Sequence, residues 1–428
     1  MLKKIFADGS SEFEFIKFLR ERNMQSMEPI QRAVSEIIGR VKNEGDEALR
    51  YYSEKFDNAK LDSFELDRSE CERALDEISP ALKRALEGAA ARISDFHSQN
   101  IPKSWIKASE DGIVTGQRAR PLERVGVYVP GGRAAYPSSV LMNVLPARCA
   151  GVSEIIMVTP PGHLEPSVMA AACIAGVDRV FSIGGAQAVA ALAFGTESVP
   201  RVDKIVGPGN IYVAEAKRQV FGTVDIDMIA GPSEILVIAD EGANPAYAAA
   251  DLLSQAEHDP LASSVLICFS EEKADAINRE IVRQNEGLSR REIIMQSVES
   301  YGTAIICKGL DEALKIADAL APEHLELMVD DAFSYLGRVK NAGSVFLGHY
   351  APEAFGDYMA GPNHVLPTGG SARFFSPLSC DDFIKKSGFI YSDRKALMAL
   401  KEDITAIAEA EGLTAHAKSI EVRFDGED

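Results

Sequence analysis

The spacing of apolar residues changes along this chain, and the change divides the chain into regions. In the first quarter, apolar residues recur every three or four positions, as they do on one face of a helix. The clearest run is Ile30, Val34, Ile37, Ile38 and Val41. The spacing predicts helices at 1–23, 29–43, 45–55 and 79–99, the first of them a short N-terminal arm. We interpret His97, in the last helix, as a structural histidine.

From residue 124 the pattern becomes one of short apolar runs, glycine turns and helical segments. Four strands of this kind are predicted at 125–129, 154–159, 179–183 and 204–206. A second series of strands is predicted at 235–239, 264–269, 303–307, 325–329 and 344–347. Strands that alternate with helices form parallel sheets with right-handed crossovers. We therefore expect an α/β protein with two sheet-containing domains, followed from residue 380 by a helical tail.

Composition narrows the classes of function. The 428 residues are 46% hydrophobic and 25% charged, as is ordinary for a globular protein. The net charge of −19 argues against nucleic acid as a partner, which would need a basic surface. Neither the start of the chain nor its most apolar region, 170–194, has the unbroken apolar run of a signal peptide or membrane span. The six cysteines form no Cys-x-x-Cys pair, so a reducing cytoplasm is expected.

The stretch Ser254-Gln255-Ala256-Glu257-His258-Asp259-Pro260 ends an apolar helical run with a cluster of polar residues. Residues three apart share one face of a helix, so Gln255 and His258 are expected to point the same way. Asp259 is expected to lie outside the helix, because a residue before proline is disfavoured in the helical region. The stretch is either the polar end of a surface helix or part of a binding site. Glu257 has no assigned role.

Two further stretches carry acid–base groups. Glu323 and His324 are adjacent just before a predicted strand, and a histidine that titrates near neutrality is suited to proton transfer. The segment 355–370 has five glycine or proline positions after Asp357, which predict a long irregular loop. Long loops with polar residues in a compact enzyme are usually functional. Near the C-terminus, Glu411 and His416 flank a predicted helix break.

Two kinds of bound group are suggested by these residues. Glycine turns after parallel strands expose backbone N–H groups to phosphate, and Gln187 and Asn210 lie just beyond two such turns. These turns lack a Gly-x-Gly-x-x-Gly fingerprint, so tight structural turns are the alternative. Oxygen and nitrogen ligands without thiolates suit a divalent metal at an open catalytic site. Candidates for such ligands are Gln255, His258, Asp357 and His416, which spacing alone does not bring together.

Five stretches resemble the L-histidinol dehydrogenase family in order and spacing, and the resemblance covers nearly the whole chain. They are 125–142 (VGVYVPGGRAAYPSSVLM), 225–238 (DIDMIAGPSEILVI), 252–260 (LLSQAEHDP), 321–325 (APEHL) and 356–370 (GDYMAGPNHVLPTGG). Five motifs in register are far more specific than any one short pattern.

The resemblance implies two incomplete Rossmann-like parallel-sheet domains with small helical N- and C-terminal segments. The expected division is an arm at 1–23, a first domain of 24–127 with 235–379, an NAD-side domain at 128–234, and a tail at 380–428. The family works as a homodimer with shared active sites, so the tail would reach the neighbouring subunit. The implied activity is the oxidation of L-histidinol through L-histidinal to L-histidine, the last steps of histidine biosynthesis. It would use two NAD⁺ and one zinc ion.

The resemblance also implies a role for individual residues. The positions that match zinc ligands are Gln255, His258, Asp357 and His416. Glu323 and His324 match the catalytic acid–base pair. The positions that match substrate contacts are Ser233 and Glu411, together with His324 and the four zinc ligands. The positions that match NAD contacts are Tyr128, Gln187 and Asn210.

Three alternatives remain open from the sequence. Aldehyde oxidation could pass through a cysteine thiohemiacetal, with Cys149 as the nearest candidate, although its apolar helical setting suggests an inert thiol. The substrate could be a related amino or hydroxy compound, although Glu411 favours a cationic one. The protein could also bind a metal or nucleotide without catalysis, which would leave the pair Glu323–His324 without a purpose.

Overall fold

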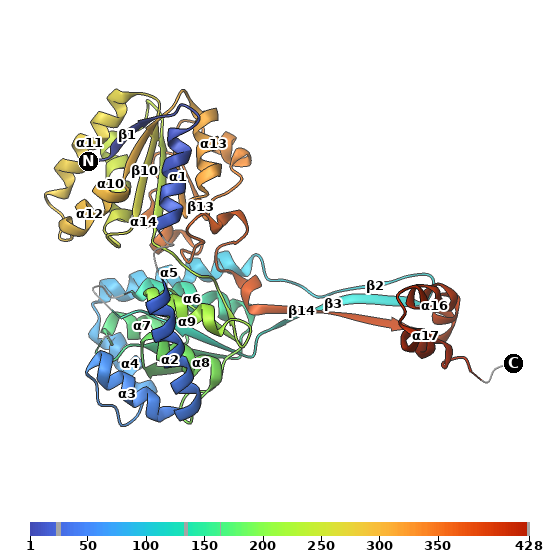
Figure 1. Ribbon diagram of the computed structural model, residues 1–428. Helices are drawn as coiled ribbons and strands as arrows, with labels where there is room; N and C mark the ends of the chain where they lie inside the picture. The colour runs from blue at the N-terminus through green and yellow to red at the C-terminus, as the bar shows by residue number, and fades with distance from the viewer. Residues whose placement is uncertain (23–26, 132–135, 163, 426–428) are drawn as a thin grey trace. The chain divides into compact units, whose positions relative to one another are not determined.

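The computed structural model describes residues 1–22, 27–131, 136–162 and 164–425 and divides into two compact units. The larger unit comprises Met1–Ile101 and Leu122–Phe383, and the smaller one comprises Pro102–Pro121 and Ile384–Asp428. Two parallel sheets lie in the larger unit, so the predicted α/β class is confirmed (Figure 1). The end of the predicted arm at Asn23, part of the 125–142 motif including Gly132, and the last three residues lie outside the described residues.

The first sheet has six strands in the order β1-β11-β10-β9-β12-β13, and all its pairs are parallel. Its strands are β1 (Lys3–Phe6), β9 (Glu234–Ala239), β10 (Ser263–Cys268), β11 (Thr303–Ile306), β12 (His324–Met328) and β13 (Ser344–Leu347). The central strands β9, β10 and β12 are buried at every position, as expected for a parallel sheet covered on both faces.

Helices cover both faces of this sheet. They are α1 (Ser11–Glu21), α10 (Pro245–Ala256), α11 (Glu271–Asn285), α12 (Arg291–Tyr301) and α13 (Leu310–Leu320). Alternate residues of a strand point to opposite faces. Accordingly, Ile235 and Val237 of β9 pack in a core with α10, α11 and α12, whereas Leu236 and Ile238 pack with α1 and α13.

The N-terminal arm differs from its prediction. The expectation of a helical segment over 1–23 is wrong for Lys3–Phe6, which forms the edge strand β1 and pairs in parallel with β11. The partner lies some three hundred residues away in the chain, so no local pattern could reveal the pairing. Helix α1 follows and buries Ile16 and Leu19 against the six-stranded sheet.

The second sheet has five parallel strands in the order β6-β5-β4-β7-β8. They are β4 (Arg124–Tyr128), β5 (Glu154–Thr159), β6 (Arg179–Ser182), β7 (Lys204–Val206) and β8 (Asp225–Ile226). The crossover helices are α6 (Pro137–Ala150), α7 (Pro166–Ala175), α8 (Gly185–Phe194) and α9 (Ile211–Val220). The strand–turn–helix units predicted from residue 124 are therefore present as one sheet.

The early helices pack with this second sheet, which differs from the expected grouping of 24–127 with 235–379. They are α2 (Glu28–Glu44), α3 (Asp46–Asp57), α4 (Arg68–Glu77) and α5 (Pro80–Ser98). The apolar stripe of α2, including Val34 and Ile37, shares a core with Phe181 of β6 and with Ala188 of α8. Burial of this stripe against the sheet explains the grouping, because an amphipathic helix is stabilised mainly by what its apolar face covers.

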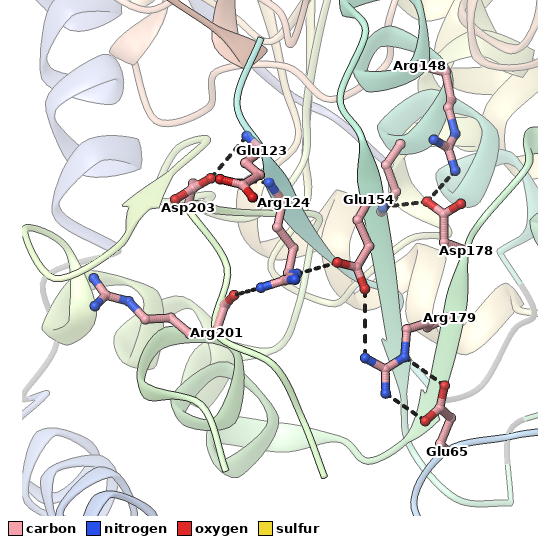
Figure 2. Close-up of polar contacts among 10 residues, drawn as sticks. Glu65, Glu123, Arg124, Arg148, Glu154, Asp178, Arg179, Arg201 and Asp203 are labelled. Atoms are coloured by element: carbon pink, nitrogen blue, oxygen red, sulfur yellow. Dashed lines mark hydrogen bonds and ion pairs between the residues drawn. The ribbon is translucent and has the colours of Figure 1, made fainter. Parts of the chain in front are cut away.

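Ion pairs join the amino ends of three of these strands, as Figure 2 shows. Arg124 at the start of β4 contacts Glu154 at the start of β5 (Nε–Oε2 2.5 Å), and Arg179 at the start of β6 contacts Glu154 (3.7 Å) and Glu65 (2.7 Å). Asp203, just before β7, accepts the backbone N–H of Arg124 at 3.1 Å. The glycine turns follow the carboxyl ends of the strands, so these charged residues lie at the opposite edge of the sheet from the turns.

The smaller unit replaces the expected helical tail with a mixed structure (Figure 1). Its antiparallel sheet has the order β14-β3-β2, built from β14 (Ile384–Ser392), β3 (Ile113–Pro121) and β2 (Trp105–Ala108). Three helices follow: α15 (Arg394–Ala399), α16 (Lys401–Ala410) and α17 (Thr414–Glu421). The tail prediction is therefore wrong for Cys380–Phe383, a 3-10 turn of the larger unit, and for the strand β14.

Buried His97 predicts a pH dependence of stability. Burial on α5 lowers the pKa of His97 to about 4, whereas an unfolded histidine titrates near pH 6.5. Between these values the unfolded chain binds an extra proton, so the folded state loses stability as the pH falls from about 6.5 towards 4. We expect His97→Gln to reduce the loss of Tm between pH 7 and pH 5 by a few degrees. Equal losses in both proteins would contradict this role.

Candidate active site

The candidate site lies at one edge of the six-stranded sheet, where β9 and β12 begin. These neighbouring strands are parallel and His324 pairs with Ile235, so Glu234 and His324 start at the same edge. Gln255 and His258 come from the end of α10, just before β10 enters the sheet at this edge. The segment after β13 adds Asp357 and returns to the same edge, where Gly369 N–H donates to the Glu234 carboxylate (3.2 Å).

One group of side chains could hold a metal ion. A ligand atom of His258, one of Glu353 and one of Asp357 all lie within 4.8 Å of one another. Gln255 joins this group through Glu353: with its amide turned to satisfy its neighbours, Nε2 donates to Glu353 Oε2 (2.9 Å) and Oε1 accepts from Glu234 N–H (3.0 Å). The predicted positions Gln255, His258 and Asp357 are therefore brought together.

Glu323 and His324 are held by one residue of the adjacent strand. Glu323 Oε2 accepts the backbone N–H of Glu234 at 2.8 Å, and His324 Nδ1 lies 3.1 Å from the carbonyl oxygen of Glu234. A carbonyl oxygen can only accept, so Nδ1 must carry the proton of the bond. The other ring nitrogen, Nε2, is buried and has no hydrogen-bond partner among the described residues. It lies 3.9 Å from Asp357 Oδ1 and from Glu353 Oε1.

Burial sets the protonation of this pair. Burial lowers the pKa of His324 to about 4, although the nearby Asp357 carboxylate opposes the shift. The imidazole is therefore neutral near pH 7, with a free lone pair on Nε2 that can accept a proton. Burial also raises the pKa of Glu323 well above its usual value, and the charges of Glu234, Glu353 and Asp357 add to the rise.

A layer of further carboxyl groups surrounds the metal candidates. Glu326 Oε1 accepts the N–H of Glu353 at 2.8 Å, and Ser254 Oγ donates to Glu353 Oε2 at 3.2 Å. Burial raises the pKa of Glu353 and of Glu326 well above the usual range, and it raises that of Asp251 to about 6. Closely spaced carboxyl groups resist joint ionisation, and a cation placed among them would lower these pKa values. The site is therefore built for positive charge.

The segment after Asp357 is anchored at several points. The prediction of an irregular loop is wrong for Gly356–Ala360, which forms a π-helical turn, a feature often found at functional sites. From Gly361 onward the chain is irregular as predicted until Ser371. Asn363 Nδ2 donates to the carbonyl oxygen of Met142 (2.7 Å), and His364 Nδ1 lies 3.2 Å from the carbonyl oxygen of Asp357. These bonds hold the segment that presents Asp357.

The predicted NAD contacts meet at the carboxyl edge of the five-stranded sheet. Tyr128 ends β4, and its hydroxyl accepts the N–H of Gly185 at the start of α8 (3.0 Å). Gln187 in the same turn is buried, and its Oε1 has no partner within the described residues. Gly207 has φ +110°, and a Cβ there would lie 2.1 Å from the carbonyl oxygen of Tyr128, so only glycine allows this approach.

Asn210 caps the next helix along this edge. Its Oδ1 accepts the N–H groups of Tyr212 and Val213 at the start of α9, at 3.0 and 3.1 Å. Helix α8 has Gly184 as its N-cap and no side-chain cap, so of its first N–H groups only that of Gly185 has a partner among the described residues, the Tyr128 hydroxyl, and the next ones are open to an anion. An open helix start, a buried unpaired amide oxygen and a glycine-lined turn fit the pyrophosphate and sugar of a dinucleotide.

Comparison with known proteins assigns the family. The family described as histidinol dehydrogenase matches residues 20–424. The chain is 52% identical to histidinol dehydrogenase of Clostridium acetobutylicum over 98% of its own length and 99% of the relative's. It is 53% identical to histidinol dehydrogenase of Bacillus cereus over 99% of both chains. The chain belongs to the histidinol dehydrogenase family.

A solved structure agrees with this membership. The crystal structure of histidinol dehydrogenase from Elizabethkingia anophelis superposes with a TM-score of 0.93 at 37% identity and covers 99% of this chain and 98% of its own. The chain is thus an enzyme, an oxidoreductase of the histidinol dehydrogenase family. Among the described residues, no helix combines the length and apolar character that crossing a bilayer requires.

The remaining predicted residues fall into two places. Ser233 immediately precedes Glu234 at the start of β9 and is partly buried beside the site. Glu411 follows the last residue of α16, and His416 lies in α17. Both tail residues therefore belong to the smaller unit, whereas every other candidate belongs to the larger one.

Sequence reasoning missed three carboxylates of this histidinol dehydrogenase site: Glu234, Glu326 and Glu353. Two of them carried a usable signal. Glu326 follows His324 by two positions in a buried strand, so both side chains point to one face, and Glu234 heads a strand that is otherwise entirely apolar. A charge in such a run rarely occurs without a partner. Glu353 lies outside regular strands, and its place became apparent only from the fold.

The cysteines argue against a thiohemiacetal route. Burial raises the pKa of the thiols of Cys71, Cys149, Cys173, Cys268, Cys307 and Cys380. A thiol with a raised pKa is mostly protonated near neutrality and is a poor nucleophile. Cys149 Sγ also lies 3.7 Å from the carbonyl oxygen of Ser94, at a helix contact.

We therefore expect Cys149→Ala to keep kcat within about twofold of the wild type, because no covalent step passes through this thiol. Steady-state oxidation rates of the two purified proteins would measure this. Circular dichroism serves as the control for folding. A folded but inactive Cys149→Ala protein would revive the covalent route.

Proposed function

We propose that this enzyme oxidises L-histidinol through L-histidinal to L-histidine with NAD⁺ and one zinc ion per subunit. The observation that carries the proposal is the Nε2 of neutral His324, which has no hydrogen-bond partner among the described residues and lies 3.9 Å from the carboxylate of Asp357, one of the metal candidates. A base, a second carboxyl group and a candidate cation site close together suit the oxidation of a cationic alcohol. The names of the relatives, all histidinol dehydrogenases, support the choice of substrate.

The metal would be held by His258 and Asp357, with Glu353 next to them. Gln255 would join them if its amide turned so that Oε1 faced these groups instead of the N–H of Glu234. The fit rests on the donor atoms of His258, Glu353 and Asp357, which lie within 4.8 Å of one another, and on the raised pKa values of Glu323 and Glu353. Imidazole, amide and carboxylate donors without thiolate suit zinc at an open catalytic site. Zinc would supply a fixed attachment point for the amine and imidazole of the substrate.

The dinucleotide would be held by Tyr128, Gln187 and Asn210 at the glycine turns. Bound NAD⁺ would supply the hydride acceptor for each of the two oxidations. The chain contributes the N–H groups that follow Gly185 at the start of α8 and the amide oxygen of Gln187, which has no partner among the described residues.

His324 and Glu323 would carry the protons. In the first oxidation, Nε2 of His324 takes the hydroxyl proton as the carbon loses hydride. Glu323, once a neighbouring cation has lowered its raised pKa, takes a proton from the water that adds to the aldehyde. In the second oxidation, His324 again takes a hydroxyl proton, now from the hydrated aldehyde. His324 must release its first proton between the two steps.

The tail would complete the site of a second subunit. We propose a homodimer in which Glu411 and His416 of the partner subunit join the site, His416 as the last metal ligand and Glu411 as a carboxylate for the cationic substrate. Both residues lie in the helical part of the smaller unit. That unit also exposes apolar side chains, including Ile106, Ile390 and Ile407, which a partner would cover.

The stoichiometry of NADH tests the proposed reaction. We expect two NADH per L-histidinol consumed, because both oxidations occur on one enzyme. Prolonged chelation should abolish the activity and added zinc should restore it, with absorbance at the NADH band as the readout. No turnover of histidinol by the zinc-loaded protein would point to a related amino or hydroxy compound as substrate. Activity that is unchanged after complete removal of the metal would contradict the proposed requirement for zinc.

Variants of the acid–base pair test the division of labour. His324→Ala should slow both oxidations by about 10²- to 10⁴-fold, because each needs the same proton acceptor. Glu323→Gln should slow mainly the aldehyde step, seen with L-histidinal as the starting substrate, since the amide cannot accept a proton from water. Unchanged activity of Glu323→Gln on histidinal would refute the assignment of Glu323.

A further inference from the structure

A buried ion pair connects the N-terminal arm to the candidate site. Arg22, the residue that caps the end of α1, places Nη2 3.1 Å from Glu234 Oε1, and the two side chains are 2% and 5% exposed. The Arg22 guanidinium also lies 5.2 Å from the ring centre of Tyr301. Its Nε and Nη1 have no hydrogen-bond partner within the part of the chain that is described. Glu234 is therefore the main anchor of this buried cation.

Glu234 is in turn the residue that holds the catalytic pair. Its N–H donates to Glu323 Oε2 (2.8 Å), and its carbonyl oxygen accepts from His324 Nδ1 (3.1 Å). The side chain of Glu234 uses its second oxygen to accept the N–H of Gly369 (3.2 Å) from the segment that carries Asp357. One residue thus contacts the acid, the base and the metal-bearing segment, while its carboxylate is tied to Arg22.

We propose that Arg22 and Glu234 act as positioning residues for Glu323 and His324, so that the N-terminal arm controls the geometry of the catalytic pair. The inference rests on the proposed function for its kinetic readout. Neither side chain contacts the reacting atoms. The ion pair fixes the Glu234 backbone, whose carbonyl oxygen keeps the proton of His324 on Nδ1 and leaves Nε2 free.

Burial explains why loss of the Arg22–Glu234 ion pair should disturb the catalytic residues. A buried carboxylate that loses its counter-charge is strongly destabilised, and it responds by protonation or by moving towards water. Either response would disturb the main-chain groups that hold Glu323 and His324. Displacement of a catalytic group by about 1 Å can cost on the order of 100-fold in rate. Replacing both charges removes the unpaired ion and should restore most of the geometry.

The variants are Arg22→Met, Arg22→Lys, Glu234→Gln and the double variant Arg22→Met/Glu234→Gln. Glu12→Ala is the matched control, because Glu12 is buried in the same helix and accepts the N–H groups of Asp8 and Gly9 (3.2 and 3.0 Å) without contacting the site. It loosens the arm without removing the ion pair. Melting temperatures of all five proteins report the loss of stability separately from the loss of activity.

Kinetics provide the first readout. Arg22→Met and Glu234→Gln should lower kcat for histidinol and for histidinal by about 10- to 100-fold. The KM for NAD⁺ should stay within about twofold, because its proposed contacts lie on the other sheet. The double variant should regain most of the lost kcat, and Arg22→Lys should lie between the wild type and Arg22→Met. Glu12→Ala should lower Tm but leave kcat within about twofold.

The tautomer of His324 provides a readout that needs no substrate. ¹⁵N spectra of histidine-labelled protein, with the His324 signals assigned by their loss in His324→Ala, distinguish a proton on Nδ1 from one on Nε2. We expect Nδ1–H alone in the wild type and in Glu12→Ala, a mixture in each single variant, and recovery of Nδ1–H in the double variant. A wild type that fails to oxidise histidinol would refute the proposed function, and the tautomer would still decide this inference.

Two results would overturn the inference. One is an Arg22→Met protein with the wild-type tautomer and a kcat within twofold of the wild type. The other is an equal loss of kcat in Glu12→Ala and in both single variants with no recovery in the double variant, which would show that loosening of the arm alone explains the effect.

Discussion

The hydrogen bond between His324 Nδ1 and the carbonyl oxygen of Glu234 is the interaction on which the proposed chemistry depends. Because this carbonyl oxygen can only accept a hydrogen bond, the ring proton must lie on Nδ1. Burial keeps the ring neutral by lowering the pKa of His324 to about 4. The lone pair of Nε2 then faces the place where carboxylates and the metal candidates converge. A base prepared in this way needs no rearrangement when a substrate hydroxyl arrives.

The two sheets contribute opposite edges to function. The glycine turns follow the carboxyl ends of β4, β6 and β7, which is where open α/β sheets ordinarily bind nucleotides. The acid–base residues instead sit where β9 and β12 begin, at the amino edge of the six-stranded sheet. Glu234 is the first residue of β9, and its N–H and C=O hold Glu323 and His324.

Local pattern predicted much of this architecture. Strands 154–159, 204–206 and 344–347 match the observed bounds, because each is an apolar run closed by turn residues. Two strands escaped prediction: β1, which pairs with β11, and β14, which pairs with β3. Their partners lie hundreds of residues away in the chain, so no local pattern reveals the pairing. The grouping of α2 with the five-stranded sheet likewise depends on which surface its apolar stripe covers. Spacing could place Gln255 near His258, but only the fold brought Glu353 and Asp357 to them.

We propose that a metal lies among His258, Gln255 and Asp357, beside the Nε2 of His324 that has no partner among the described residues. Crystals of the zinc-loaded protein, with anomalous diffraction recorded on both sides of the zinc absorption edge, test this directly. We expect one strong edge-dependent peak per site, bounded by the imidazole of His258, the amide of Gln255 and the carboxylate of Asp357. A zinc peak elsewhere in the fold, or none at these residues in a fully active crystal, would contradict it.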